Sequence, residues 1–219
     1  MRTHTERLEL FKSSDLYPVV SSQYCNSRNV CEVVEQIALG GAKIVQIREK
    51  HLSDCALFEL VTRCKKITDR FQMLLMVDDH VDIAMAAGAD GVHLGQEDFP
   101  LTMAKKIAPE LLFGISTHNA SEIEKAQKEG CSYLNMGPMF PTQTKSVPCG
   151  ALGLEKILEL KENVTVPFSI MGGIKEHHLE LLCAKGFRHI AMVTEITMAP
   201  DITAKVRQLR NIMQKGTAL

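Results

Sequence analysis

Short apolar segments recur along the whole chain, and each is followed by a stretch in which apolar residues return every three or four positions. The apolar segments contain few polar residues, so they are typical of parallel strands that are buried on both faces. The stretches between them have the spacing of amphipathic helices. We expect strands at 16–21, 43–48, 74–78, 91–95, 112–116, 133–137, 168–171 and 189–194.

Capping signals support helices in the intervals between these strands. Residues 29–39 have helical spacing and end at Gly40 and Gly41, a pair typical of a helix C-terminus. Ser53 is a suitable N-cap for a helix over 53–71, which carries its charges on one face. Further helices are expected over 81–87, 101–108, 120–129, 153–160, 177–185 and 201–215.

A strand followed by a helix, eight times in succession, predicts an α/β protein with the (β/α)8 fold, the TIM barrel. The length of 219 residues suits a single domain, since such barrels commonly take ~200–250 residues. We expect a catalytic barrel domain over 16–219 and an N-terminal extension over 1–15, whose short helix lies across the domain. An open doubly wound sheet is the alternative, but it would not explain functional residues at nearly every strand end.

Composition and charge limit the partners. The net charge of −1 and the absence of Trp provide no basic, aromatic surface for nucleic acid. No apolar run approaches the ~20 residues of a membrane span, and the charged N-terminus is unlike a signal peptide. The seven cysteines include no CxxC pair, which favours reduced thiols in a cytoplasmic protein. We therefore expect neither nucleic-acid nor membrane partners, and we leave the formation of a homo-oligomer open.

Cationic and amide side chains end the second predicted strand. Gln46, Arg48 and Lys50 alternate along the chain, so they point to one side. Arg offers a planar fork for phosphate oxygens and Lys adds a point charge, so an anion site near the barrel mouth is expected. The alternative is an exposed edge on which Glu49 pairs locally with these cations.

Two carboxylates, Asp79 and Asp98, end the third and fourth strands. Mg²⁺ prefers one or two carboxylates together with phosphate oxygens of a substrate, and these residues lie where such a site is expected. Each precedes a predicted helix, so the alternative is that they are helix N-caps.

The segment after the sixth strand is long and contains Thr142, Thr144 and Lys145 between prolines. A polar loop of this kind at a strand end is typical of a lid over a site, and the alternative is a solvated surface loop. Gly172 and Gly173 follow the seventh strand, where backbone N–H groups often bind phosphate in this fold. His93 and His118 also end strands, and a lone His in such a place is more often structural.

Together, these segments resemble the thiamine phosphate synthase (thiamine-phosphate pyrophosphorylase) family. The matching motifs, which span about residues 16–196, are VQIREK, the VDD before VDIAMAAGADGVHLGQED, GISTH, GPMFPTQTK with GLE downstream, and MGGI. The resemblance implies a Mg²⁺-assisted transferase. It would join 4-amino-2-methyl-5-hydroxymethylpyrimidine diphosphate to thiazole phosphate by dissociative substitution, making thiamine phosphate and releasing diphosphate.

The resemblance also implies a role for each matched residue. The diphosphate would be held by Gln46, Arg48 and Lys50, and Mg²⁺ by Asp79 and Asp98. Ser116 would lie beside the pyrimidine, and Thr142, Thr144 and Lys145 would bind both substrates from the lid. The thiazole phosphate would be bound at Gly173, Val193 and Thr194. Arg48, Lys50, Ser116 and Lys145 would be the residues nearest the chemistry.

Three positions depart from the family pattern. Asp78, which we also assign to substrate binding, replaces the usual Asn, Thr194-Glu195 replaces Ser-Ala, and Asn135 replaces a glycine. Glu195 in particular places a negative charge beside the expected phosphate site. Two alternative functions follow: a thiazole tautomerase-like paralogue that uses His118, and a non-catalytic regulatory paralogue that binds a thiamine precursor.

Overall fold

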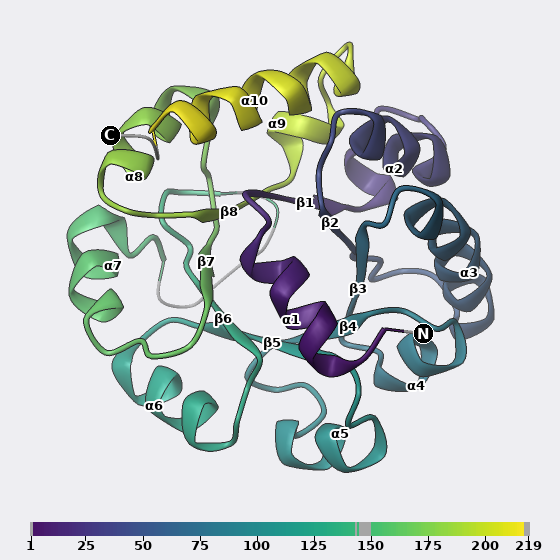
Figure 1. Ribbon diagram of the computed structural model, residues 1–219, viewed down its shortest axis with the longest axis horizontal. Coiled ribbons are helices and arrows are strands. Elements are labelled where there is room, and N and C mark those ends of the chain that lie inside the picture. The colour runs from purple at the N-terminus through teal and green to yellow at the C-terminus, as the bar shows by residue number, and fades with distance from the viewer. Residues whose placement is uncertain (1, 143, 145–149, 217–219) are drawn as a thin grey trace.

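The computed structural model, which describes residues 2–142, 144 and 150–216, is a closed barrel of parallel strands surrounded by helices (Figure 1). The strands neighbour one another in chain order, and β8 pairs with β1 to close the barrel. The predicted (β/α)8 fold is therefore confirmed, and the open sheet is wrong. The strands are β1 (Leu16–Val20), β2 (Ile44–Ile47), β3 (Leu74–Asp78), β4 (Gly91–Leu94), β5 (Leu112–Thr117), β6 (Tyr133–Met136), β7 (Phe168–Ile170) and β8 (His189–Met192).

Helices occupy every predicted interval. They are α1 (His4–Lys12), α2 (Val30–Leu39), α3 (Asp54–Arg70), α4 (Val81–Ala86), α5 (Leu101–Ile107), α6 (Ala120–Lys128), α7 (Gly153–Lys161), α8 (Leu179–Ala184), α9 (Thr194–Thr197) and α10 (Ile202–Gly216). Two short 3₁₀ helices, η1 (Ser22–Tyr24) and η2 (Glu176–His178), precede α2 and α8. The described part of the chain contains no helix with the length and apolar character needed to cross a bilayer.

The eighth strand is shorter than predicted. It ends at Met192, because the Val193 carbonyl accepts hydrogen bonds from the backbone N–H groups of Ile196 and Thr197, both at 3.0 Å. These bonds begin α9, which the sequence did not predict. Thr194 therefore lies on a helical turn at the end of the barrel rather than in a strand.

The strands separate two apolar cores. Side chains that point inward fill the barrel, and those that point outward pack beneath the helices, so the strands are buried on both faces. The apolar residues of the barrel interior include Tyr17, Val19, Ile44, Leu74, Met76, Leu112, Tyr133 and Ala191.

Helix α1 covers the end of the barrel at which the strands begin (Figure 1). Phe11 is fully buried there and stacks on Tyr133, with ring centroids 4.2 Å apart. Arg7, also buried, contacts the carboxylate of Asp90 and the carbonyl of Glu110, both of which precede strands. Helix α1 therefore covers this end, and the cavities described below lie at the opposite end, where the strands terminate.

Candidate active site

Arg48 and Lys50 follow β2 and face the acidic end of β3. Arg48 Nε lies 3.4 Å and Lys50 Nζ 2.7 Å from Asp78 Oδ2, and Lys50 also contacts Asp79. Burial lowers the pKa of Lys50, but the facing Asp78 and Asp79 carboxylates outweigh it and raise the pKa overall. Lys50 is therefore held as a cation at the barrel mouth.

Glu49 does not pair with these cations, so this part of the exposed-edge alternative is wrong. Glu49 is buried and accepts hydrogen bonds from the backbone N–H and the hydroxyl of Ser22, at 2.6 and 2.8 Å. Its carboxylate therefore ties β2 to the end of β1, and the side chains of Arg48 and Lys50 face the site instead. The two cations line a cavity of about 430 Å³ together with Thr144.

Gln46 lies deeper than the two cations. Only 2% of its surface is exposed, and its Nε2 donates to the Tyr17 hydroxyl at 3.0 Å. The structure thus places Gln46 on the same inward-facing side as Arg48, as the alternation predicts, but inside the barrel rather than among the residues that line the cavity.

A buried chain of hydrogen bonds crosses the barrel from Gln46 to Ser116. The hydroxyls of Tyr17 and Tyr133 are 2.8 Å apart, and Tyr133 Oη lies 3.2 Å from His93 Nδ1. His93 Nε2 lies 2.8 Å from Ser116 Oγ at the end of β5. Burial raises the pKa of both tyrosines, so both remain protonated and able to donate.

Sequence analysis missed Tyr17 and Tyr133 as parts of the site. The available signal was the occurrence of two hydroxyl-bearing rings at inward-pointing positions of strands whose other residues are mostly apolar. Gly114 permits this arrangement, because a Cβ at that position would overlap the Tyr133 ring. His93 is buried in the barrel and orients Ser116 through their hydrogen bond.

Asp79 and Asp98 approach one another across the ends of β3 and β4. Burial raises the pKa of Asp98, and the Asp79 carboxylate adds to this, against the opposing effects of the Gly95 N–H and Lys50. Asp98 Oδ2 accepts the Gly95 N–H at 2.6 Å. Helix α4 begins after His80 and α5 after Pro100, so neither aspartate is a helix N-cap and that alternative is wrong.

The chemistry of these carboxylates fits a divalent cation. Asp78 is buried beside Asp79, and its Oδ2 forms ion pairs with Lys50 Nζ at 2.7 Å and Arg48 Nε at 3.4 Å. Asp79 adopts a left-handed backbone (φ 62°), which an aspartate tolerates better than most residues. Within the described residues no three acidic, His or Cys side chains already form a complete metal cluster. A hard cation here would take its remaining ligands from water and substrate.

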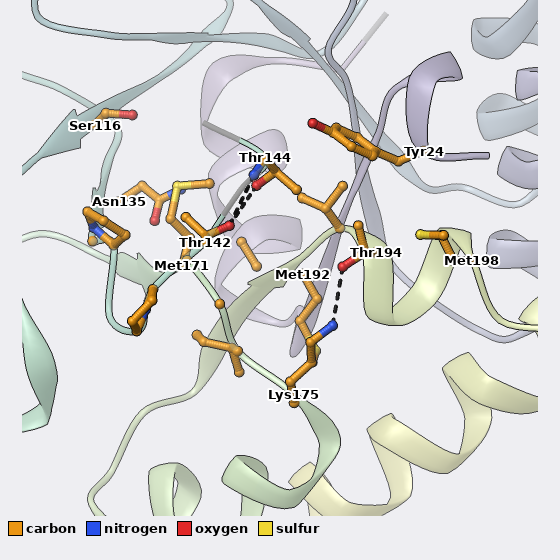
Figure 2. Close-up of a pocket in the computed structure, with 18 of the residues that line it drawn as sticks. Tyr24, Ser116, Asn135, Thr142, Thr144, Met171, Lys175, Met192, Thr194 and Met198 are labelled. Atoms are coloured by element: carbon orange, nitrogen blue, oxygen red, sulfur yellow. Dashed lines mark hydrogen bonds between the residues drawn. The ribbon is translucent and has the colours of Figure 1, made fainter. Parts of the chain in front are cut away.

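A second cavity, of about 450 Å³, lies beside the first and shares Thr144 with it. Thr142 and Thr144 project into it from the loop after β6, with their hydroxyls 3.0 Å apart (Figure 2). Lys145 lies outside the described residues. The other predicted residues that line this cavity are Ser116, Gly173, Val193 and Thr194.

Gly172 and Gly173 are needed for a close approach of two loops. A Cβ on Gly173 would lie 2.5 Å from the Pro141 carbonyl oxygen, and Gly172 accepts a hydrogen bond from the Phe140 N–H at 2.9 Å. The glycine pair therefore positions the loop that carries Thr142 and also lines the cavity. The first of these roles was not predicted.

Asn135 and His118 are among the other polar residues that line the same cavity. Asn135 is almost fully buried, and its Oδ1 has no hydrogen-bond partner in the part of the chain that the structure describes. His118 is oriented by Glu122, whose Oε2 lies 2.9 Å from the ring Nδ1 and 2.8 Å from the backbone N.

Comparisons with known proteins find similarity over nearly the whole chain. The family model described as thiamine monophosphate synthase matches residues 16–196. A thiamine-phosphate synthase of Caldicellulosiruptor saccharolyticus is 38% identical over 96% of this chain and 96% of its own length. One of Pelotomaculum thermopropionicum is 37% identical over 92% and 93% of the two chains.

Solved structures agree with this. A thiamine phosphate pyrophosphorylase from Pyrococcus furiosus superposes with a TM-score of 0.86 at 31% identity, covering 96% of this chain and 98% of that one. A 3-hexulose-6-phosphate synthase superposes with a TM-score of 0.67 at 18% identity, covering 91% and 99%, and shows the fold alone.

Proposed function

We infer that this chain, which belongs to the thiamine monophosphate synthase family, is a transferase that couples a pyrimidine diphosphate to thiazole phosphate. The observation that supports this most directly is the pair of adjoining cavities at the open end of the barrel. One is lined by Arg48 and Lys50 and suits a diphosphate. The other cavity has a more apolar wall and suits the pyrimidine and thiazole rings.

The reaction needs positioning more than acid–base catalysis. The carbon–oxygen bond to diphosphate breaks, the electron pair leaves with the diphosphate, and the thiazole nitrogen forms the new carbon–nitrogen bond. An electron-rich aminopyrimidine stabilises the cationic carbon. The protein must then stabilise the leaving group and hold the thiazole nitrogen close to that carbon.

Each predicted residue has a place in this scheme. Arg48 and Lys50 hold the diphosphate, and Asp78 positions them before substrate binds. Ser116, which His93 holds in place, lies beside the pyrimidine. The Gln46 amide donates to Tyr17 and so begins the hydrogen-bond chain that ends at Ser116. Thr142, Thr144 and Lys145 bind both substrates, while Gly173, Val193 and Thr194 hold the thiazole phosphate.

Asp79 and Asp98 would hold Mg²⁺, with Asp78 beside them. When bound, Mg²⁺ supplies positive charge to the diphosphate oxygens and so stabilises the leaving group. Lys50 then exchanges its contact with Asp79 for one with the diphosphate. Burial, followed by the nearby Asp79 carboxylate, raises the pKa of Asp98, and a bound cation would oppose both effects.

The remaining expectations join this proposal. Residues 16–219 form the catalytic domain and 1–15 an extension that covers its closed end. The protein acts on small phosphorylated substrates in the cytoplasm.

A coupling assay tests the function. Purified protein is mixed with the pyrimidine diphosphate, thiazole phosphate and Mg²⁺, and thiamine phosphate is detected after oxidation to a fluorescent thiochrome. We expect product formation that EDTA stops. Arg48→Ala should lower kcat/KM by about 100-fold or more, as loss of one preorganised donor does elsewhere. Arg70→Ala, at an exposed ion pair on α3, is the matched control.

His118 is the discriminating residue for the tautomerase alternative, because it lines the cavity beside Ser116. His118→Ala should lower coupling only modestly. Loss of the native activity in His118→Ala, with Asp98→Ala fully active, would exclude the synthase. Substrate binding without turnover in the presence of Mg²⁺ would indicate the regulatory paralogue.

A further inference from the structure

Lys175 lies beside the proposed thiazole-phosphate position, and sequence analysis did not identify it. It follows Gly173 and Ile174 in the loop after β7 and lines the 450 Å³ cavity. Its ammonium group lies 3.3 Å from Thr194 Oγ1 at the start of α9 (Figure 2). The loops after β7 and β8 are thus joined at the cavity wall by a positively charged side chain.

Glu195 is turned toward cations. Its Oε2 lies 3.3 Å from Lys175 Nζ, and its Oε1 lies 3.8 Å from Lys205 Nζ on α10. Lys205 is also 2.8 Å from Glu176. The four side chains carry two positive and two negative charges, so Glu195 adds no unbalanced negative charge to the site.

We propose that Lys175 is a further substrate-binding residue that contacts the phosphate of the thiazole substrate, and that Glu195 occupies its ammonium group until the phosphate arrives. This rests on the proposed function, because that function supplies the phosphorylated substrate. A Lys ammonium has three donors and rotates freely on its stem, so it can keep Thr194 and exchange the Glu195 carboxylate for a phosphate oxygen.

The arrangement has a consequence for specificity. The backbone N–H groups proposed for this phosphate are neutral, whereas Lys175 carries a full charge and favours a dianion over an uncharged alcohol. Lys175 therefore contributes to the preference for thiazole phosphate over the unphosphorylated thiazole alcohol. It has no comparable effect on the pyrimidine diphosphate, which binds beside Arg48 and Lys50.

Lys175→Met and Glu195→Gln test the proposal because it predicts effects of opposite sign. Lys175→Met removes the charge and should raise the KM for thiazole phosphate about tenfold, with kcat and the KM for pyrimidine diphosphate nearly unchanged. Glu195→Gln removes the competing carboxylate and should lower the KM for thiazole phosphate about threefold. An ion pair with a purely structural role would not raise the KM for thiazole phosphate in Lys175→Met and lower it in Glu195→Gln.

Lys156→Met is the matched control, because Lys156 pairs with Glu159 at 2.7 Å on the surface of α7 and has a similar exposure to Lys175. It should leave both KM values unchanged. Calorimetric titration of thiazole phosphate, and of the thiazole alcohol, into the wild type and Lys175→Met gives a readout that does not depend on turnover. The proposal predicts that only the phosphorylated compound loses affinity in Lys175→Met.

The outcomes separate this inference from the proposed function. A wild type that makes thiamine phosphate, with an unchanged thiazole phosphate KM in Lys175→Met, refutes the role of Lys175 and leaves the synthase intact. A wild type without coupling activity refutes the function. In that case, weaker thiazole phosphate binding by Lys175→Met still supports the site, and equal binding refutes it.

Discussion

Asp90 is expected to contribute more to stability than any surface charge of the protein, through contacts that join α1 to the barrel. Its carboxylate is 2% exposed and lies 3.4 Å from Arg7, 3.2 Å from Arg2 and 3.1 Å from Lys65. It also accepts the Leu75 N–H at 3.1 Å. Asp90→Ala removes all four contacts at once.

The expected cost follows from the burial of Arg7, whose side chain is only 4% exposed. Removing one member of a buried ion pair leaves the other charge uncompensated and costs about 3–5 kcal/mol. For a domain of this size each kcal/mol lowers the Tm by about 2–4 °C, so Asp90→Ala should melt about 6–20 °C below the wild type. The Tm of Asp90→Asn, which keeps a hydrogen-bond acceptor, should lie between those of Asp90→Ala and the wild type.

Asp69→Ala is the matched control, because Asp69 pairs with the same Lys65 but is 56% exposed. It should cost about 0–1 kcal/mol. Urea unfolding followed by circular dichroism measures the free energy of unfolding of each variant. Adding Arg7→Met to Asp90→Ala should restore part of the loss, since it removes the buried charge. Equal free energies for Asp90→Ala and Asp69→Ala would refute the reasoning.

Three further predictions concern the site and its surroundings. Asp98→Asn should raise the Mg²⁺ concentration for half-maximal coupling about tenfold or more, and an unchanged Mg²⁺ requirement would exclude Asp98 as a ligand. In the wild type this concentration should fall as pH rises through the raised pKa of Asp98, because the deprotonated carboxylate binds the cation. Gly114→Ala should cost about 1–3 kcal/mol in a thermal melt, because the added methyl group overlaps the buried Tyr133 ring, and an unaltered Tm would show that the ring yields. Alkylation of Cys31 by iodoacetamide, followed by mass spectrometry, should reach half its maximal rate near pH 7, because the Cys64 thiol at 3.9 Å lowers the pKa of Cys31 to about 7. The pH of half-maximal alkylation should rise in Cys64→Ala, and an unchanged pH would show that Cys64 does not lower the pKa.

Much of the fold was predictable from local pattern. The continuous apolar runs, the helical spacing between them and the Ser53 cap are properties of near neighbours in the chain. Eight repeats of strand and helix leave few architectures other than the barrel. Parallel strands then place Arg48, Asp79, Asp98, Ser116 and Gly173 at one end, so their proximity also followed from the sequence.

The contacts within that end depended on tertiary structure. Closure of the barrel determines how deep each inward-facing side chain lies, and it separates Gln46, which meets Tyr17, from Arg48 at the mouth. Glu195 contacts Lys175 and also Lys205, which arrives on α10 from a later part of the chain.

The sequence by itself determined the order and type of the elements, the barrel and the family, because these follow from periodicity and short motifs. Only the tertiary structure decided which charges meet. It pairs Lys50 with Asp78 and Asp79, links His93 to Ser116 and places Lys175 at the cavity wall. Such pairings depend on strand register and loop path, which bring together residues far apart in sequence, and no local pattern encodes them.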